Sequence, residues 1–164
     1  MVSLPTFDQL AELDPVLKTN APPEYEDLNG HVNVVHHLSL HMQVCMAALA
    51  QAGVEARVAD DGFTIFSAEH HLKYLNEIRI GDELEGRARL LGRGAKTVHG
   101  ISVLTDVTTG TIAGLCEWVQ MAVNLNERRS TPFPEHIAAA LDATIEQHEA
   151  LPWSLPRAGT MGAR

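Results

Sequence analysis

Basic residues are scarce in this chain of 164 residues. Lysine and arginine together number 12 against 21 acidic residues, which gives a net charge of −9 and a pI near 5.4. Such a balance argues against non-specific nucleic-acid binding and against attachment to membranes through a polybasic patch. A local pair of cations such as Arg128 and Arg129 can still serve an anionic ligand.

Cysteine and long apolar runs are also scarce. Cys45 and Cys116 lie inside apolar segments and cannot form a disulfide framework, so a reducing compartment is expected. The first residues, MVSLPTFDQL, lack the features of a signal peptide. The best candidate for a membrane span, residues 34–53, contains three histidines and two glutamines. We therefore expect a cytoplasmic protein.

Residues 34–52 contain no aspartate, glutamate, lysine or arginine. Apolar side chains recur there with helical spacing, at Val35, Leu38, Met42, Cys45 and Leu49. This pattern predicts a helix, and Gly53 is a plausible stop. A surface helix would carry charges on its outer face, so this helix is predicted to be covered on most sides.

The pattern changes to strands after this helix. Alternating and β-branched residues predict strands over 63–74, 83–91, 96–107 and 111–125, followed by an amphipathic helix over 135–148. An extended segment ending near Glu26 is expected to supply the first strand, and a short helix over 6–13 precedes it. One apolar helix against one bent antiparallel sheet is an α+β arrangement, the hotdog fold. We expect a helical extension (1–20), a hotdog domain (21–150) and an irregular tail (151–164).

A polar cluster directly precedes the predicted helix, in the stretch YEDLNGHVNVVHH at residues 25–37. It resembles the signature loop of hotdog thioesterases, which reads D-x-x-G-H-V-N-N in the 4-hydroxybenzoyl-CoA thioesterase-like group and D-x-N-x-H-V-N-N in plant acyl-ACP thioesterases. The pieces PEYEDLNGHVN, FSAEHHLKYLNEIRIGD, LLGRGAKTVHG and NERRSTPFP look most like the carnitine-catabolism branch, which hydrolyses betainyl-CoA. This resemblance covers roughly two thirds of the chain.

The resemblance implies an acyl-CoA thioesterase with a small or polar acyl group. It implies coenzyme A as part of the substrate and no separate cofactor. A hotdog chain leaves a free sheet edge, so a homodimer or a dimer of dimers is expected, with the loop of one subunit beside the sheet of the other.

The residue types in the loop suit thioester hydrolysis. A helix N-terminus stabilises negative charge, so the N–H groups from Gly30 to Val32 could form an oxyanion site. Asp27 could act as a general base on water or as the nucleophile. Asn29 could orient water or substrate, and His31 could fix the loop or contact the thioester. The alternative is ordinary capping chemistry before a helix.

The helix is where the sequence departs from the family pattern. Val34 stands where the family usually has asparagine, and His37 stands where many members have tyrosine. Some relatives use a glutamate of this helix as the catalytic carboxylate, and the helix here has no acid. Asn33 is placed as the N-cap and, with His37, as a candidate substrate contact. His37 and His41 have the i, i+4 spacing of metal ligands but lack the glutamate of H-E-x-x-H, so no metal is expected.

Other candidate site residues lie in the strands and turns. Glu69 shares a predicted strand face with Phe63 and Ile65, where desolvation would raise its pKa and suit it to catalysis, unless it faces solvent. Glu117 carries the same ambiguity and could pair with a histidine or an arginine across the sheet. Lys96, Arg128 and Arg129 could contact the phosphates of CoA or be ordinary surface cations.

Two other functions stay open from the sequence. One is a hotdog enoyl-CoA hydratase, whose aspartate and histidine follow D-x-N-x-x-H, although the spacing from Asn29 to His31 is one residue shorter. The other is a non-catalytic acyl-CoA-binding module.

Overall fold

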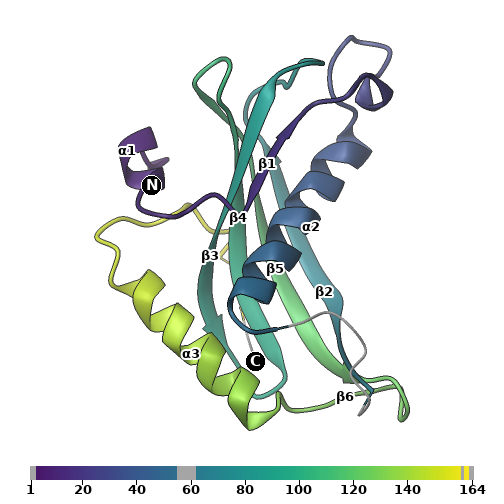
Figure 1. Ribbon diagram of the computed structural model, residues 1–164, viewed down its shortest axis with the longest axis vertical. Coiled ribbons are helices and arrows are strands. Elements are labelled where there is room, and N and C mark those ends of the chain that lie inside the picture. The colour runs from purple at the N-terminus through teal and green to yellow at the C-terminus, as the bar shows by residue number, and fades with distance from the viewer. Residues whose placement is uncertain (1–2, 55–61, 160, 163–164) are drawn as a thin grey trace.

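The computed structural model describes residues 3–54, 62–159 and 161–162. Those residues form three α-helices, six strands and one short 3-10 helix (Figure 1). In chain order they are α1 (Phe7–Leu10), β1 (Leu17–Asn20), the 3-10 helix (Pro23–Tyr25), α2 (Val34–Gln51), β2 (Phe63–Tyr74), β3 (Glu83–Arg93), β4 (Thr97–Asp106), β5 (Thr111–Asn124), β6 (Arg129–Ser130) and α3 (Glu135–Glu149). None of the helices in these ranges is long and apolar enough to cross a membrane.

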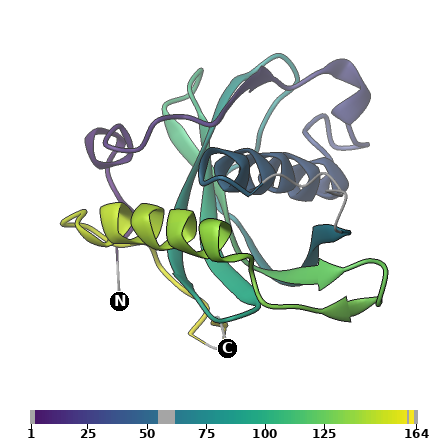
Figure 2. The same ribbon diagram turned by 60° about the horizontal axis from the view of Figure 1, so that its bottom comes forward.

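The strands form one antiparallel sheet in the order β1-β3-β4-β5-β2, and β6 pairs with β5. The sheet curves around α2, while α3 packs against β3 (Figure 2). The predicted α+β hotdog fold is confirmed. Within the described ranges β2 pairs with β5 alone, and it is therefore an edge strand there.

The observed boundaries follow the sequence pattern closely in the second half of the chain. β2 spans the predicted residues, and β3, β4, β5 and α3 end within two residues of their predicted positions. The first strand was misplaced: it is β1, whereas the expected strand segment forms the 3-10 helix. Residues 1–20, expected to be a helical extension, thus also supply an edge strand that pairs with β3. The short strand β6 was not predicted.

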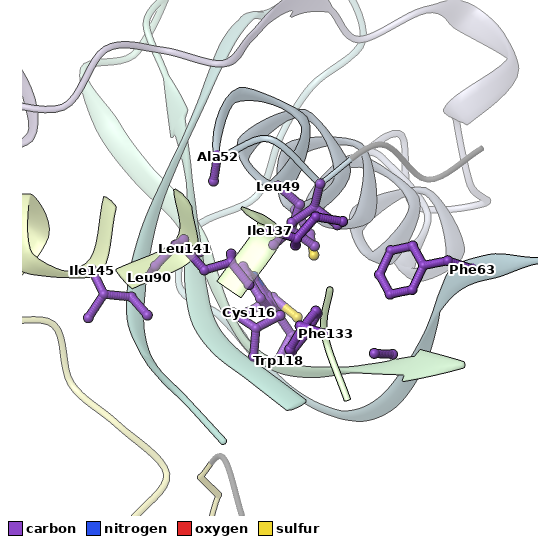
Figure 3. Packing of buried hydrophobic residues seen from close by; sticks show 14 residues of the cluster. Leu49, Ala52, Phe63, Leu90, Cys116, Trp118, Phe133, Ile137, Leu141 and Ile145 are labelled. Atoms are coloured by element: carbon purple, nitrogen blue, oxygen red, sulfur yellow. The ribbon is translucent and has the colours of Figure 1, made fainter. Parts of the chain in front are cut away.

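The main core lies between α2, α3 and the inner face of the sheet (Figure 3). Cys45 and Leu49 of α2 are fully buried there with Trp118 of β5 and Leu141 of α3. A Cβ atom at Gly100 would stand 2.3 Å from the Trp118 ring, so the indole can occupy this position only beside a glycine.

The opposite face of the sheet is covered by the two ends of the chain. Leu10 of α1 and Leu155 of the segment 151–159 pack against Ile101 and Leu115. Residues 151–159 have no regular secondary structure, and this tail is also held by a polar contact. The Ala158 N–H donates to Oε2 of Glu117 at 2.5 Å.

Glu117 lies beneath this tail. Its Oε1 atom is 2.8 Å from Nε2 of His99, so the suggested pairing with a histidine across the sheet is confirmed. Both side chains are buried, and together with the tail contact they leave Glu117 engaged in the fold rather than free for catalysis.

The predicted burial of α2 is wrong for the first half of the helix. Val34, Val35 and Leu38 are exposed, and Val35 keeps 67% of its accessible surface. His37 and His41 face the sheet instead, because the two histidines and the buried Leu40 lie on the inner side of the helix. The uncharged outer face is therefore not covered by any described part of this chain.

Candidate active site

The loop before α2 is held in place by backbone hydrogen bonds. The Val32 N–H donates to the Ile78 carbonyl at 2.9 Å, and the Asn33 N–H donates to the Tyr25 carbonyl at 2.8 Å. Asn33 is the N-cap of α2, as predicted, because its Oδ1 accepts the Val35 N–H at 3.0 Å. The start of the helix is therefore clamped between two neighbouring segments.

Asp27 closes the loop on itself. Its Oδ1 accepts the N–H groups of Asn29 at 2.8 Å and of His31 at 3.4 Å, while its Oδ2 accepts from the Asn29 side-chain amide at 3.2 Å. The Asn29 N–H is the main cause of a lowered pKa for Asp27, so this carboxylate is ionised at neutral pH. Oδ2 carries one hydrogen bond and is the oxygen with more capacity left for chemistry.

The N–H groups expected to form the oxyanion site have acceptors within the chain. The Gly30 N–H donates to the Asp27 carbonyl at 3.1 Å, and the N–H groups of His31 and Val32 are also bonded within the chain. The Val34 N–H, at the first position of α2, has no acceptor among the described residues. The first N–H groups of any helix lack intrahelical partners, and this general rule could have identified Val34 from the sequence.

His31 lies between two carboxylates. Its Nδ1 is 3.5 Å from Asp27 Oδ1, and its Nε2 is 3.5 Å from Glu77 Oε2. Glu77 in turn pairs with Arg79 at 2.8 Å. This arrangement supports the suggested role of His31 in fixing the loop. The carboxylates of Asp27 and Glu77 make the surface around the loop, here called the lip of the site, predominantly acidic.

Glu69 does not have the expected environment. A β-bulge between Ser67 and Glu69 breaks the alternation on which the prediction rested. Because β2 is also an edge strand, Glu69 is exposed to solvent rather than buried beside Phe63 and Ile65. Within one chain it is not a desolvated carboxylate.

The three predicted CoA-binding cations gather at the other end of β2. Lys96 Nζ donates to the Ser130 carbonyl at 3.4 Å, next to Arg128 and Arg129, and all three cations are exposed. Arg129 pairs with Asn124 opposite the start of β2, while Tyr74 at its end touches His37. A strand of 12 residues is roughly 36 Å long at about 3.3 Å per residue. One chain therefore does not bring these cations to Asp27.

Two of the three histidines of α2, His37 and His41, are neutral groups in the interior. Nδ1 of His41 is 2.9 Å from the Ser102 hydroxyl, and burial together with neighbouring His37 lowers the pKa of His41 to about 3. Burial also lowers the pKa of His37, whose ring meets the Tyr74 ring edge-on at 5.3 Å. No group of three or more possible metal ligands occurs among the described residues.

The chain belongs to the thioesterase-like superfamily, whose family model matches residues 21–141. It is 32% identical over 136 residues to a betainyl-CoA thioesterase of Pseudomonas aeruginosa, an alignment covering 82% of this chain and 86% of that protein. It is also 25% identical to an L-carnitine dehydrogenase/betainyl-CoA thioesterase of Rhizobium meliloti, covering 83% of this chain but 27% of that longer enzyme.

Solved structures share the fold. A Staphylococcus aureus protein in complex with CoA superposes with a TM-score of 0.80 at 21% identity, covering 93% of this chain and 96% of that one. A 1,4-dihydroxy-2-naphthoyl-CoA thioesterase from Synechocystis gives a TM-score of 0.68 at 12% identity, covering 77% and 93%. The prediction of an acyl-CoA thioesterase is confirmed by the family and by the relatives. The roles of individual residues stay predictions.

Proposed function

We propose that this thioesterase hydrolyses short, cationic acyl-CoA substrates, with betainyl-CoA as the specific candidate, at the N-terminus of α2. The observation that carries the proposal is the free Val34 N–H at the start of a capped helix, close in the chain to the ionised Asp27. The relative from Pseudomonas aeruginosa supports the choice of acyl group. Two buried free cysteines support a cytoplasmic location.

The Val34 N–H donates to the thioester oxygen and, with the helix dipole, stabilises the charge that develops there. Oδ2 of Asp27 forms a bond to the acyl carbon, and the CoA thiolate leaves and takes a proton from water. Water then cleaves the mixed anhydride, which releases the acid and regenerates the carboxylate. Activation of water by Asp27 as a general base is the other route to the same products.

The charges near the loop favour a cationic acyl group. Glu26, Asp27 and Glu77 stand around the lip with one nearby guanidinium, Arg79. These carboxylates attract a quaternary ammonium and repel phosphates. The phosphates of CoA therefore require cations from elsewhere, and Lys96, Arg128 and Arg129 are the matching group.

A homodimer supplies these cations. On one side β2 pairs with no strand among the described residues, and Phe66 and Leu38 leave apolar surface exposed beside it. If two copies pair antiparallel along β2, the two-fold axis puts the start of one strand beside the end of the other. The basic end of one chain then lies beside the Asp27 loop of its partner. The Phe66→Glu variant should shift dimers to monomers in light scattering, and an unchanged mass would reject this interface.

A hydrolysis screen tests the function itself. Thiol release would be followed with betainyl-, acetyl-, hexanoyl- and benzoyl-CoA, and betainyl-CoA is expected to give the highest kcat/KM. Hydrolysis of the other thioesters in preference to betainyl-CoA would reject the proposed acyl group. No thiol release from any of them would reject the proposed hydrolysis at this site.

A further inference from the structure

The aromatic rings of His37, in the first turn of α2, and Tyr74, at the end of β2, pack against each other. His37 is buried, with 5% of its surface exposed, and its ring stands at 85° to that of Tyr74 with centroids 5.3 Å apart. Tyr74 is 51% exposed, so much of its ring is open to a ligand. The Cα of His37 lies three residues beyond that of Val34, which is about 4.5 Å along the helix axis at 1.5 Å per residue.

The rings of His37, His41 and Tyr74 are uncharged at neutral pH. Burial lowers the pKa of His37 and brings that of His41 to about 3, while burial raises the pKa of the Tyr74 hydroxyl. Nδ1 of His37 and Nε2 of His41 are buried and have no hydrogen-bond partner among the described residues. These rings neither repel a cation nor require a hydrogen-bond donor from it.

The spacing fits a very short acyl group. In a betainyl group one methylene joins the ammonium nitrogen to the carbonyl carbon, the same connection as N–Cα–C in a peptide, so the two atoms are about 2.5 Å apart. With the carbonyl oxygen on the Val34 N–H, the ammonium group lies within one helical turn of the helix start. His37 belongs to this same turn, and its ring touches that of Tyr74.

We propose that Tyr74 binds the quaternary ammonium of the acyl group through its ring, and that His37 holds this ring in position. The inference rests on the proposed function and assigns its acyl specificity to two residues. Aromatic faces attract quaternary ammonium groups through their quadrupole, and methylated nitrogen offers no hydrogen bond that a polar pocket could use. A neutral imidazole behind the phenol keeps the subsite free of positive charge.

The test compares betainyl-CoA with tert-butylacetyl-CoA, which has the same shape and no charge. The ratio of the two kcat/KM values would be measured for the wild type, Tyr74→Leu and Tyr74→Phe. Tyr25→Leu is the matched control, because Tyr25 is the only other tyrosine and stacks on His36 instead. Loss of the ring in Tyr74→Leu should lower the ratio about 5- to 30-fold. Tyr74→Phe and Tyr25→Leu should keep the ratio near that of the wild type.

Equal losses on both substrates in Tyr74→Leu would overturn the inference, because they would show a structural role for the ring. If the wild type prefers betainyl-CoA and Tyr74→Leu loses activity on neither substrate, the inference would also be overturned, and the proposed function would stay intact. A wild type that releases thiol from neither substrate would overturn both. Thermal unfolding of each variant separates a misfolded protein from an altered site. His37→Gln removes the ring that supports Tyr74, so it should also lower the ratio of the two kcat/KM values.

Discussion

Two sides of this molecule differ in how they are covered. The outer face of the sheet is closed by α1 and by the segment 151–159, which bury Ile101, Val103 and Leu115. The side formed by β2 and the first half of α2 is left open, with Val35 and Tyr74 exposed. The closed side contributes stability, whereas the open side leaves exposed the surface on which the proposed site and the proposed dimer depend.

The largest expected effect lies on the open side. Asp27→Asn should reduce kcat by about 10²- to 10⁴-fold, the range for a group acting in proton transfer or attack. The melting temperature should change little, because an asparagine Oδ1 can still accept the Asn29 N–H. Glu24→Gln is the control, since Glu24 is an exposed carboxylate near the same loop. More than a tenth of the wild-type kcat in Asp27→Asn would remove this residue from the mechanism.

A core truncation on the closed side should affect stability instead. Ile101→Ala removes buried methyl groups and is expected to cost about 2–5 kcal/mol of unfolding free energy. Val35→Ala, on the open side, should cost less than about 0.5 kcal/mol in the monomeric chain. Urea denaturation at low protein concentration measures both. Similar losses for the two variants would mean that the sides do not differ in this way.

The buried His41 should make the free energy of unfolding depend on pH in the acid range. Its pKa is about 3 in the folded chain against 6.5 for a free histidine, so unfolding takes up a proton below pH 6.5. The stabilisation is complete above pH 6.5 and is lost as the pH falls toward 3, by roughly 1.4 kcal/mol per unit. Denaturation between pH 7 and about 5 should show this extra slope in the wild type and not in His41→Gln. Parallel curves would contradict a neutral, buried His41.

A small effect is expected at the surface contact between β3 and α3, which lies away from both of these sides. Arg93 pairs with Asp142 and links β3 to α3, but Asp142 is largely exposed. Asp142→Asn should therefore cost only about 0.2–1 kcal/mol in urea denaturation, and less at high salt. A loss of unfolding free energy comparable to that of Ile101→Ala would show that charge, rather than apolar packing, holds α3 against β3.

The sequence carries enough information for the fold because its signals are local. Helical spacing, an N-cap at Asn33 and alternating strands place most elements within two residues. The exposure of Val35 and of Glu69 was beyond local reasoning. An uncharged helix face looks the same whether its own chain or a second copy covers it, and a bulge at Ser67 leaves no clear sequence mark.

The candidate site divides along the same line. The loop residues from Asp27 to Asn33 could be recognised because they form one continuous segment. Tyr74 and Glu77 were missed because they are distant in sequence and meet this region only in the fold, Tyr74 through the ring of His37 and Glu77 through His31. The proposed donor at Val34 was not predicted, because the family pattern at this position concerns the side chain and not the N–H.

Mixing two impaired variants tests the shared site most directly. Asp27→Asn would be combined with the double variant Arg128→Glu/Arg129→Glu, and thiol release would be measured at low substrate concentration. A mixed dimer has one site with both lesions and one intact site, so equal mixing should restore about a quarter of the wild-type activity. No recovery, with subunit exchange shown by mass spectrometry of labelled chains, would contradict a site built from two copies.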